Sequence, residues 1–130
     1  MSADRMQIGE VAERVGLSLR TIRFYEEAGL VIPTARSTGG FRLYAESHID
    51  RLLLIKQMKP LGLSVEEIGK VLHVLDALSG RATSGSERAE LLAELAEYRS
   101  MVDDRIERLT ARLAGARDLS EHLRGAIDAG

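Results

Sequence analysis

Arginines and aromatic residues alternate in one stretch of the sequence, SLRTIRFYEEAGLVIPTARSTGGFRLY, which spans residues 18–44. An arginine guanidinium can hold a phosphate with two hydrogen bonds or read O6 and N7 of guanine. Hydroxyl groups of Ser, Thr and Tyr suit phosphate oxygens. The stretch therefore has the chemistry of a nucleic-acid-binding surface, and the candidate contacts in its first part are Ser18, Arg20, Thr21, Arg23 and Tyr25.

The charges are unevenly distributed along the chain, which carries a formal net charge of −2. No acidic residue occurs from 14 to 25 or from 28 to 45, and these two windows contain five arginines. Local positive patches of this kind displace counterions from nucleic acid whatever the net charge of the protein. Charge alone is equally compatible with a basic face that contacts only solvent.

Two short helices are predicted to position the first of these arginines. Apolar residues at helical spacing predict a helix over residues 8–15 that ends at Gly16, where a left-handed cap is easiest. Ser18 can cap a second helix, which ends at Gly29 and is anchored by Ile22. Two short helices joined by about three residues predict a helix-turn-helix.

A β-hairpin is predicted to follow, because β-prone residues flank the pair Gly39-Gly40. Alternation along the second strand places Phe41 and Leu43 against the helices and points Arg42 and Tyr44 away. A two-stranded ribbon needs such support from helices. The expected structure is a small basic wing.

Two more helices complete the predicted domain. One spans residues 46–58 and is ended by Pro60 and Gly62, and the capping box of Ser64 and Glu67 opens the next. The polar segment SGRATSGS then predicts a hinge. We expect a mainly α fold with a winged helix-turn-helix domain at 1–78, the hinge at 79–86 and a coiled-coil dimerisation helix at 87–130.

The predicted long helix repeats apolar residues on a seven-residue register. Nine of its eleven seam positions between Leu92 and Ile127 are apolar, with Arg99 and Ser120 as the exceptions. A second copy of the chain would cover this seam, and folding back onto the chain's own domain is the competing interpretation. Arg99 would cost stability while fixing register. The residues predicted to make the dimer are Leu92, Leu95, Val102, Ile106, Leu109 and Leu113.

Several classes of function are disfavoured by what the sequence lacks. The absence of cysteine excludes disulfides, thiolate metal sites and iron–sulfur clusters. His73 with Asp76, and His122 with Asp118, each supply fewer than the three ligands of a local metal site. With no long apolar run, signal peptide or catalytic motif, we expect a cytoplasmic protein with no membrane span, no cofactor and no enzymatic activity.

The sequence also resembles a known family. From Ile8 to Leu72 it is similar to the DNA-binding domain of the MerR family of bacterial transcription regulators. The resemblance is carried by IRFYE at 22–26, by GL at 29–30 and by GFRLY at 40–44. The helix after residue 86 fits the family by position and pattern.

This resemblance implies a homodimer held by an antiparallel coiled coil. It implies recognition-helix contacts from Arg20 and Arg23, a phosphate contact from Tyr25, and wing contacts from Arg36, Arg42 and Tyr44. Phe24 and Phe41 occupy positions where tyrosine is common, so hydroxyl contacts are lost there. The implied DNA-binding set is Ser18, Arg20, Thr21, Arg23, Tyr25, Arg36, Gly40, Arg42, Tyr44 and Lys59, the last near a second wing with an unusual Pro60.

The family mechanism implied is control of a promoter through the shape of its DNA. A homodimer on a pseudo-palindromic site bends and untwists an overlong spacer, so that RNA polymerase meets both promoter elements. The sequence lacks the cysteines and the appended ligand domain with which other members sense their effectors. An effector of this chain would therefore be a small molecule bound near residues 73–90, or a partner protein. Two alternatives are a ligand-independent architectural DNA-bending protein and a coiled-coil protein-interaction module.

Overall fold

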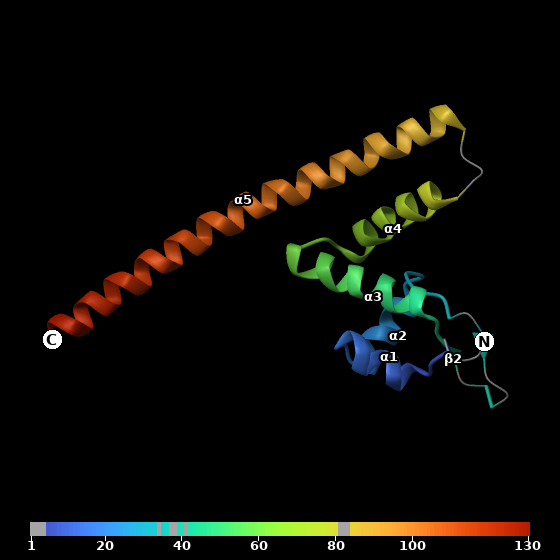
Figure 1. Ribbon diagram of the computed structural model, residues 1–130, viewed down its shortest axis with the longest axis horizontal. Coiled ribbons are helices and arrows are strands. Elements are labelled where there is room, and N and C mark those ends of the chain that lie inside the picture. The colour runs from blue at the N-terminus through green and yellow to red at the C-terminus, as the bar shows by residue number, and fades with distance from the viewer. Residues whose placement is uncertain (1–4, 34, 37–38, 41, 81–83) are drawn as a thin grey trace. The chain divides into compact units, whose positions relative to one another are not determined.

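The computed structural model describes residues 5–33, 35–36, 39–40, 42–80 and 84–130, and for Ala35 and Arg36 it describes the backbone only. The chain divides into two compact units, Met1–Ser79 and Gly80–Gly130. The expected mainly helical fold with one small strand pair is confirmed (Figure 1). Its elements are α1 (Ile8–Val15), α2 (Leu19–Glu27), β1 (Ala35–Arg36), β2 (Arg42–Leu43), α3 (Glu46–Met58), the 3₁₀ helix η2 (Lys59–Leu61), α4 (Val65–Ser79) and α5 (Gly85–Ala129).

The predicted helix-turn-helix is formed by α1 and α2. Gly16 ends α1 in the left-handed region with φ 70°, and its N–H donates to the carbonyl of Ala12. Ser18 then caps α2 by accepting from the N–H of Thr21. Because α1 packs against both α2 and α3, with Val11 and Val15 buried, the turn holds α2 at a fixed angle to the rest of the unit.

The end of α2 is also closed as its sequence predicts. Gly29 adopts φ 79°, and the N–H of Leu30 donates to the carbonyl of Tyr25. Leu30 is buried at 4% exposure and provides the apolar contact that accompanies such a cap. Recognition of both ends from the sequence was possible because every contact involved lies within five residues.

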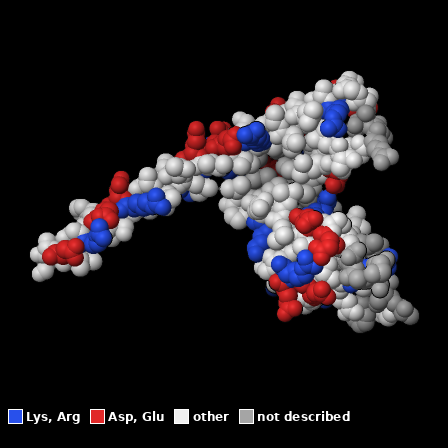
Figure 2. Space-filling view, in the orientation of Figure 1, with Lys and Arg blue, Asp and Glu red and all other residues white. Residues whose placement is uncertain are grey.

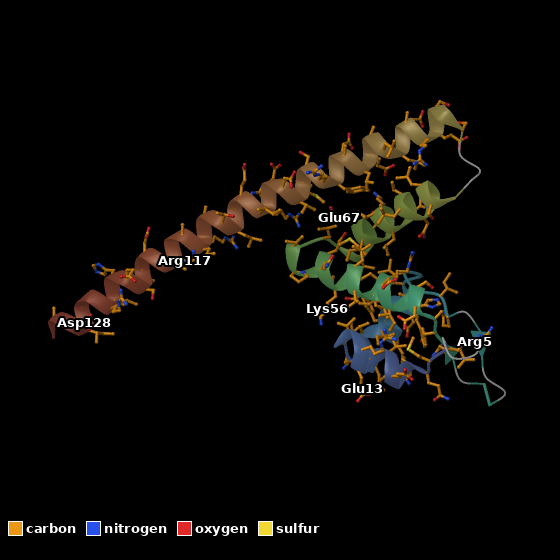
Figure 3. All side chains as sticks on the ribbon, in the orientation of Figure 1. Arg5, Glu13, Lys56, Glu67, Arg117 and Asp128 are labelled. Carbon is orange, nitrogen blue, oxygen red and sulfur yellow. The ribbon has the colours of Figure 1, made fainter. Side chains whose placement is uncertain are left out.

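A lysine on α3 binds the carboxyl end of α1, next to the turn that leads to α2. The ammonium of Lys56 on α3 donates to the carbonyl of Val15 at 2.8 Å, and Figure 3 shows Lys56 extending from α3 toward α1. A cation at a helix C-terminus is favoured by the helix dipole. A second link joins α1 to α3. Arg14 donates two hydrogen bonds to the carboxylate of Glu46 and lowers the pKa of Glu46.

Replacing Gly16 by alanine is expected to destabilise the first unit by about 1–2 kcal/mol. Alanine at this position would have to keep the left-handed backbone conformation, and its Cβ would lie 2.9 Å from the Lys56 ammonium. Gly9→Ala is the matched control, because nothing lies within 4 Å of its Cβ and alanine favours helix. Thermal unfolding should show a lower midpoint for Gly16→Ala and an unchanged or higher one for Gly9→Ala; equal midpoints would contradict this.

The wing consists of the antiparallel pair β1 and β2, with Ala35 opposite Leu43 and Arg36 opposite Arg42. Gly40 alone of the predicted glycine pair has a positive φ, 85°. The ribbon continues on its other side, where the backbone of Tyr44 exchanges two hydrogen bonds of 2.7 Å with that of Met6. The predicted packing of Phe41 lies outside the described residues.

Helices α3 and α4 complete the first unit. Helix α3 ends at Met58, and Gly62 closes η2 with φ 88°. The predicted capping box is confirmed, because Ser64 accepts from the N–H of Glu67 while the Glu67 carboxylate accepts from the N–H of Ser64. The core of the pair is made by Ile49, Leu52, Ile55, Ile68, Val71, Leu72 and Val74.

The second unit is dominated by α5, a single helix of 45 residues. Ser84 caps it by accepting from the N–H of Glu87, so the helix begins at Gly85. None of its residues is buried. Among the helices of the described ranges, none has both the length and the apolar composition needed to cross a bilayer.

Candidate nucleic-acid interface

Helix α2 presents its arginines on one side and its anchor on the other. Arg20 and Arg23 are exposed and lie three residues apart, hence on one face, and Phe24 beside them is 52% exposed. Ile22 is fully buried, as predicted. Figure 2 shows basic and acidic side chains next to one another on the visible face of this unit, so its charge is not of one sign there. Binding of an anion on this face therefore depends on individual arginines and not on a broad positive surface.

The first turn of α2 is ordered by two hydroxyl groups. The Ser18 hydroxyl accepts from the N–H of Thr21 at 3.0 Å and donates to the Thr21 hydroxyl at 2.9 Å. Both residues thus have a structural role that the sequence predicted only for Ser18. The remaining N–H groups of the first turn have no helical acceptor, and such groups suit a phosphate oxygen.

A cleft of about 270 Å³ separates α2 from the wing. Arg23 lines it from α2 and Arg42 from β2, so the structure brings two of the predicted contacts to one hollow. The Arg42 Nε lies 3.3 Å from the Oε1 of Glu26, whose side chain is 7% exposed against 42% for Arg42. The other lining residues are Glu26, Glu27, Val31, Ile32 and Pro33.

The predicted orientation of Tyr44 is wrong. Tyr44 is fully buried, its hydroxyl included, and its ring meets that of His48 edge-on with centroids 5.7 Å apart. Strand β2 ends at Leu43, so the alternation expected from Arg42 does not extend to residue 44, where the chain pairs with Met6 instead. The side chain of Tyr44 belongs to the core and has no surface to offer a ligand.

Tyr25 likewise serves the core, with 5% of its surface exposed. Its ring lies 5.8 Å from that of Phe24, and burial raises the pKa of its hydroxyl. The phenol therefore stays neutral over a wider range of pH than an exposed tyrosine. Its predicted contact with phosphate stays a prediction.

The remaining candidate residues lie at three different places. Gly40 is exposed at the tip of the wing, and Arg36 pairs with Arg42 through the backbone, its side chain being outside what the structure describes. Lys59 is exposed in η2, between α3 and α4, and is not among the residues that line the cleft.

Two residues that sequence reasoning missed fix the segment between α2 and the wing. Arg51 donates through Nε to the carbonyl of Leu30 and through Nη1 to both carboxylate oxygens of Asp76, at 2.9 and 3.1 Å. His48 accepts from the N–H of Ala45 at Nδ1 and meets the carbonyl of Ile32 at 2.6 Å through Nε2. Leu30, Ile32 and Asp76 are 16 to 25 residues away from the side chains that they meet, so no local pattern could reveal these contacts.

Helix α5 has a strip of exposed leucine and isoleucine residues. Ion pairs join charged residues along the helix, Arg99 with Asp103 at 3.9 Å and Arg124 with Glu121 at 2.8 Å. Figure 2 shows acidic and basic groups alternating toward its C-terminal end. The strip contains Leu92, Ile106, Leu109, Leu113, Leu123 and Ile127, each 46% exposed or more, while Leu95 and Val102 are partly exposed.

Comparison with known proteins places this geometry in a family. The model of the MerR HTH family regulatory proteins matches residues 6–75, which is more than half of the chain. The HTH-type transcriptional regulator CueR of Salmonella typhi is 35% identical over 103 residues, covering 75% of each chain.

Two solved structures are similar to this chain over most of its length. The regulator PbrR691 from Ralstonia metallidurans CH34, determined in complex with lead(II), has a TM-score of 0.57 at 32% identity, covering 91% of this chain and 81% of that one. HiNmlR, a MerR family regulator lacking the sensor domain and bound to promoter DNA, has a TM-score of 0.67 at 24% identity, covering 91% and 86%, and supports the fold. With its capped helix-turn-helix, wing and long C-terminal helix, the chain belongs to the MerR family of HTH-type transcriptional regulators.

Proposed function

We propose that this regulator binds a pseudo-palindromic promoter site as a homodimer and controls transcription by bending and untwisting the DNA. The observation that carries the proposal is the placement of Arg20 and Arg23 on the exposed face of a capped, anchored α2, with Arg42 of the wing across one cleft. In the proposal, residues 1–78 form the DNA-binding domain, 79–86 a hinge and 87–130 the dimerisation helix, although α4 extends to Ser79 and α5 already begins at Gly85.

The proposed contacts divide by chemistry. Arg20 and Arg23 read base edges from the major groove, where a guanidinium can meet guanine O6 and N7 together. Ser18, Thr21 and the first N–H groups of α2 approach phosphate oxygens. The wing adds contacts in the adjoining groove, and a further phosphate contact lies between α3 and α4. These supplementary residues are Arg36, Gly40, Arg42 and Lys59.

A second copy of the chain is proposed to cover the apolar strip of α5. A helix that leaves such a strip in water gains about 1.5–3 kcal/mol for each leucine that association buries. A two-fold symmetric dimer carries two copies of α2, and the DNA site must then share that symmetry. The antiparallel coiled coil is the arrangement that we propose.

Bending supplies the proposed link to transcription. Smooth bending of a site of 20–30 base pairs by 40–90° costs about 1–6 kcal/mol, which phosphate contacts offset. RNA polymerase at the same promoter is the proposed reader of the deformed spacer. A small-molecule effector would act only by binding two states of the dimer unequally.

Selection from a pool of random DNA duplexes tests the proposal without knowledge of the operator. The purified protein should enrich one sequence with two-fold symmetry, and the complex should migrate with the anomalous mobility of bent DNA when the site is moved along a fragment. Failure to enrich any sequence would contradict DNA recognition. Enrichment without bending would contradict the proposed mechanism alone.

Replacing Arg99 by leucine is expected to tighten the proposed dimer about tenfold. Arg99 occupies a seam position, where a charged side chain weakens a coiled coil, and leucine would restore an apolar layer. Arg108→Leu removes the same charge outside the seam and should leave the dissociation constant unchanged. Sedimentation equilibrium over a concentration series measures both; an unchanged or weaker Arg99→Leu dimer would count against the proposed seam.

A further inference from the structure

Two neighbouring glutamates lie where the proposed function brings negatively charged DNA. Glu26 and Glu27 are the only acids between Arg14 and Ala45, and both line the cleft between α2 and the wing. Carboxylates there repel phosphate, so each lowers the affinity for DNA of any sequence unless it does something else. Their surroundings differ, since Glu27 is exposed and the Glu26 side chain is 7% exposed.

The less exposed member of the pair, Glu26, faces the arginine of the wing. Oε1 of Glu26 lies 3.3 Å from Nε of Arg42, which joins α2 to β2. A guanidinium held at Nε keeps its outer N–H groups for another ligand and loses freedom to turn. Arg42 remains 42% exposed, so part of its surface stays open to a partner.

The same carboxylate lies in a cleft that a second arginine, Arg23, also lines. Arg23, Glu26 and Arg42 line one hollow, and a negative charge in the same hollow lowers the repulsion between two arginines. A carboxylate with so little exposure is retained at a cost that only charged or hydrogen-bonding partners offset. The cleft thus has one exposed acid, Glu27, and one acid, Glu26, whose side chain is 7% exposed and pairs with an arginine.

We infer that Glu26 is a positioning residue, which fixes the direction of the Arg42 guanidinium and the spacing of the wing from α2, and thereby raises the preference for the specific site over other DNA. This inference rests on the proposed DNA binding. It assigns Glu26 no contact with DNA. Its charge lowers the affinity for all sequences, while its geometry favours one of them.

Matched variants separate the two effects. The probes are the duplex that the wild-type protein enriches from the random pool and a scrambled duplex of equal length. Glu27→Gln should tighten binding to both duplexes by the same few-fold factor. Glu26→Gln should weaken binding to the enriched duplex about tenfold while leaving or tightening binding to the scrambled one, so that only Glu26→Gln lowers the ratio of the two affinities.

A second variant and a double-mutant cycle distinguish loss of the Glu26–Arg42 contact from a general loss of folding. Glu26→Asp keeps the charge but is one methylene shorter, and should lower the affinity ratio without changing binding to the scrambled duplex. In the Arg42→Ala background, Glu26→Gln should lower the ratio no further. Circular dichroism confirms that each variant is folded.

Two results would overturn the inference while leaving the proposed function intact. One is a Glu26→Gln variant that tightens binding to both duplexes as Glu27→Gln does. The other is a loss that persists in full without Arg42. If the wild-type protein enriches no sequence at all, the proposed function fails first, and the inference fails with it.

Discussion

Arg23→Ala is expected to weaken binding to the enriched duplex by about 5- to 150-fold, the range for loss of one good base-reading contact. Arg23 is exposed on α2 and lines the cleft that faces the wing, whereas the neighbouring Ile22 is buried and only anchors the helix. The loss should be concentrated at one base pair, because the variant no longer distinguishes bases there. Competition with singly substituted duplexes measures this.

The control for net charge is Arg108→Ala on α5, which removes the same charge far from α2 in the sequence. It should leave both the affinity and the base preference unchanged. Equal weakening of all substituted duplexes by Arg23→Ala would contradict base reading by Arg23 and assign it to phosphate. No weakening at all would remove α2 from the interface.

Leu109→Lys is expected to dissociate the dimer and to lower the affinity for the enriched duplex at least 100-fold. Leu109 lies near the middle of α5, is 46% exposed in the single chain and occurs at a seam position. Burial of two such leucines per dimer contributes about 3–6 kcal/mol, and two lysine charges in the seam would add an unfavourable term. A monomer carries one α2 and reads one half-site.

Ala111→Lys provides the control, because residue 111 lies outside the seam and is exposed. Sedimentation should give a monomer for Leu109→Lys and a dimer for Ala111→Lys, with DNA affinity following the dimer. A Leu109→Lys variant that stays dimeric would contradict the proposed interface. A monomer that binds the enriched duplex as well as the wild type would contradict two-fold recognition.

The helix ends were predictable because their determinants are local. Ser18 caps α2 through a contact three residues away, Gly16 and Gly29 each adopt a positive φ, and the box of Ser64 and Glu67 closes within one turn. Such interactions depend on few residues, so their types can be read from sequence. Once these ends were placed, the order of helix, turn, helix and hairpin could be predicted as well.

The details of the cleft were not predictable, because they depend on distant partners. Tyr44 was expected to face outward, yet the pairing of its backbone with Met6 turns it inward. Alternation fails in a strand of two residues, whose side chains are directed by whatever the chain meets next. The pairs of Glu26 with Arg42 and of Arg51 with Asp76 are formed only once α2, α3, α4 and the wing are assembled.

The seam of α5 was predictable as a face but not as an interface. Its seven-residue repeat identifies which side of the helix is apolar, and Leu113 and Leu123 on that side are exposed in the single chain. Periodicity alone carries no record of the partner that covers the face. A charged residue beside the seam, such as Asp103, pairs within the helix in the single chain, and the same residue type would also suit an ion pair across a dimer.

Binding to the DNA immediately upstream of the protein's own gene, measured in a salt series with footprinting and with the stoichiometry of the complex, tests the central claim most directly. We predict protection of a two-fold site by two copies of the chain, with an affinity that falls steeply as salt rises, because the contacts to phosphate release counterions. Binding no tighter than to random DNA, at concentrations where the dimer is intact, would contradict recognition at that site. Protection by a single copy would contradict the homodimer.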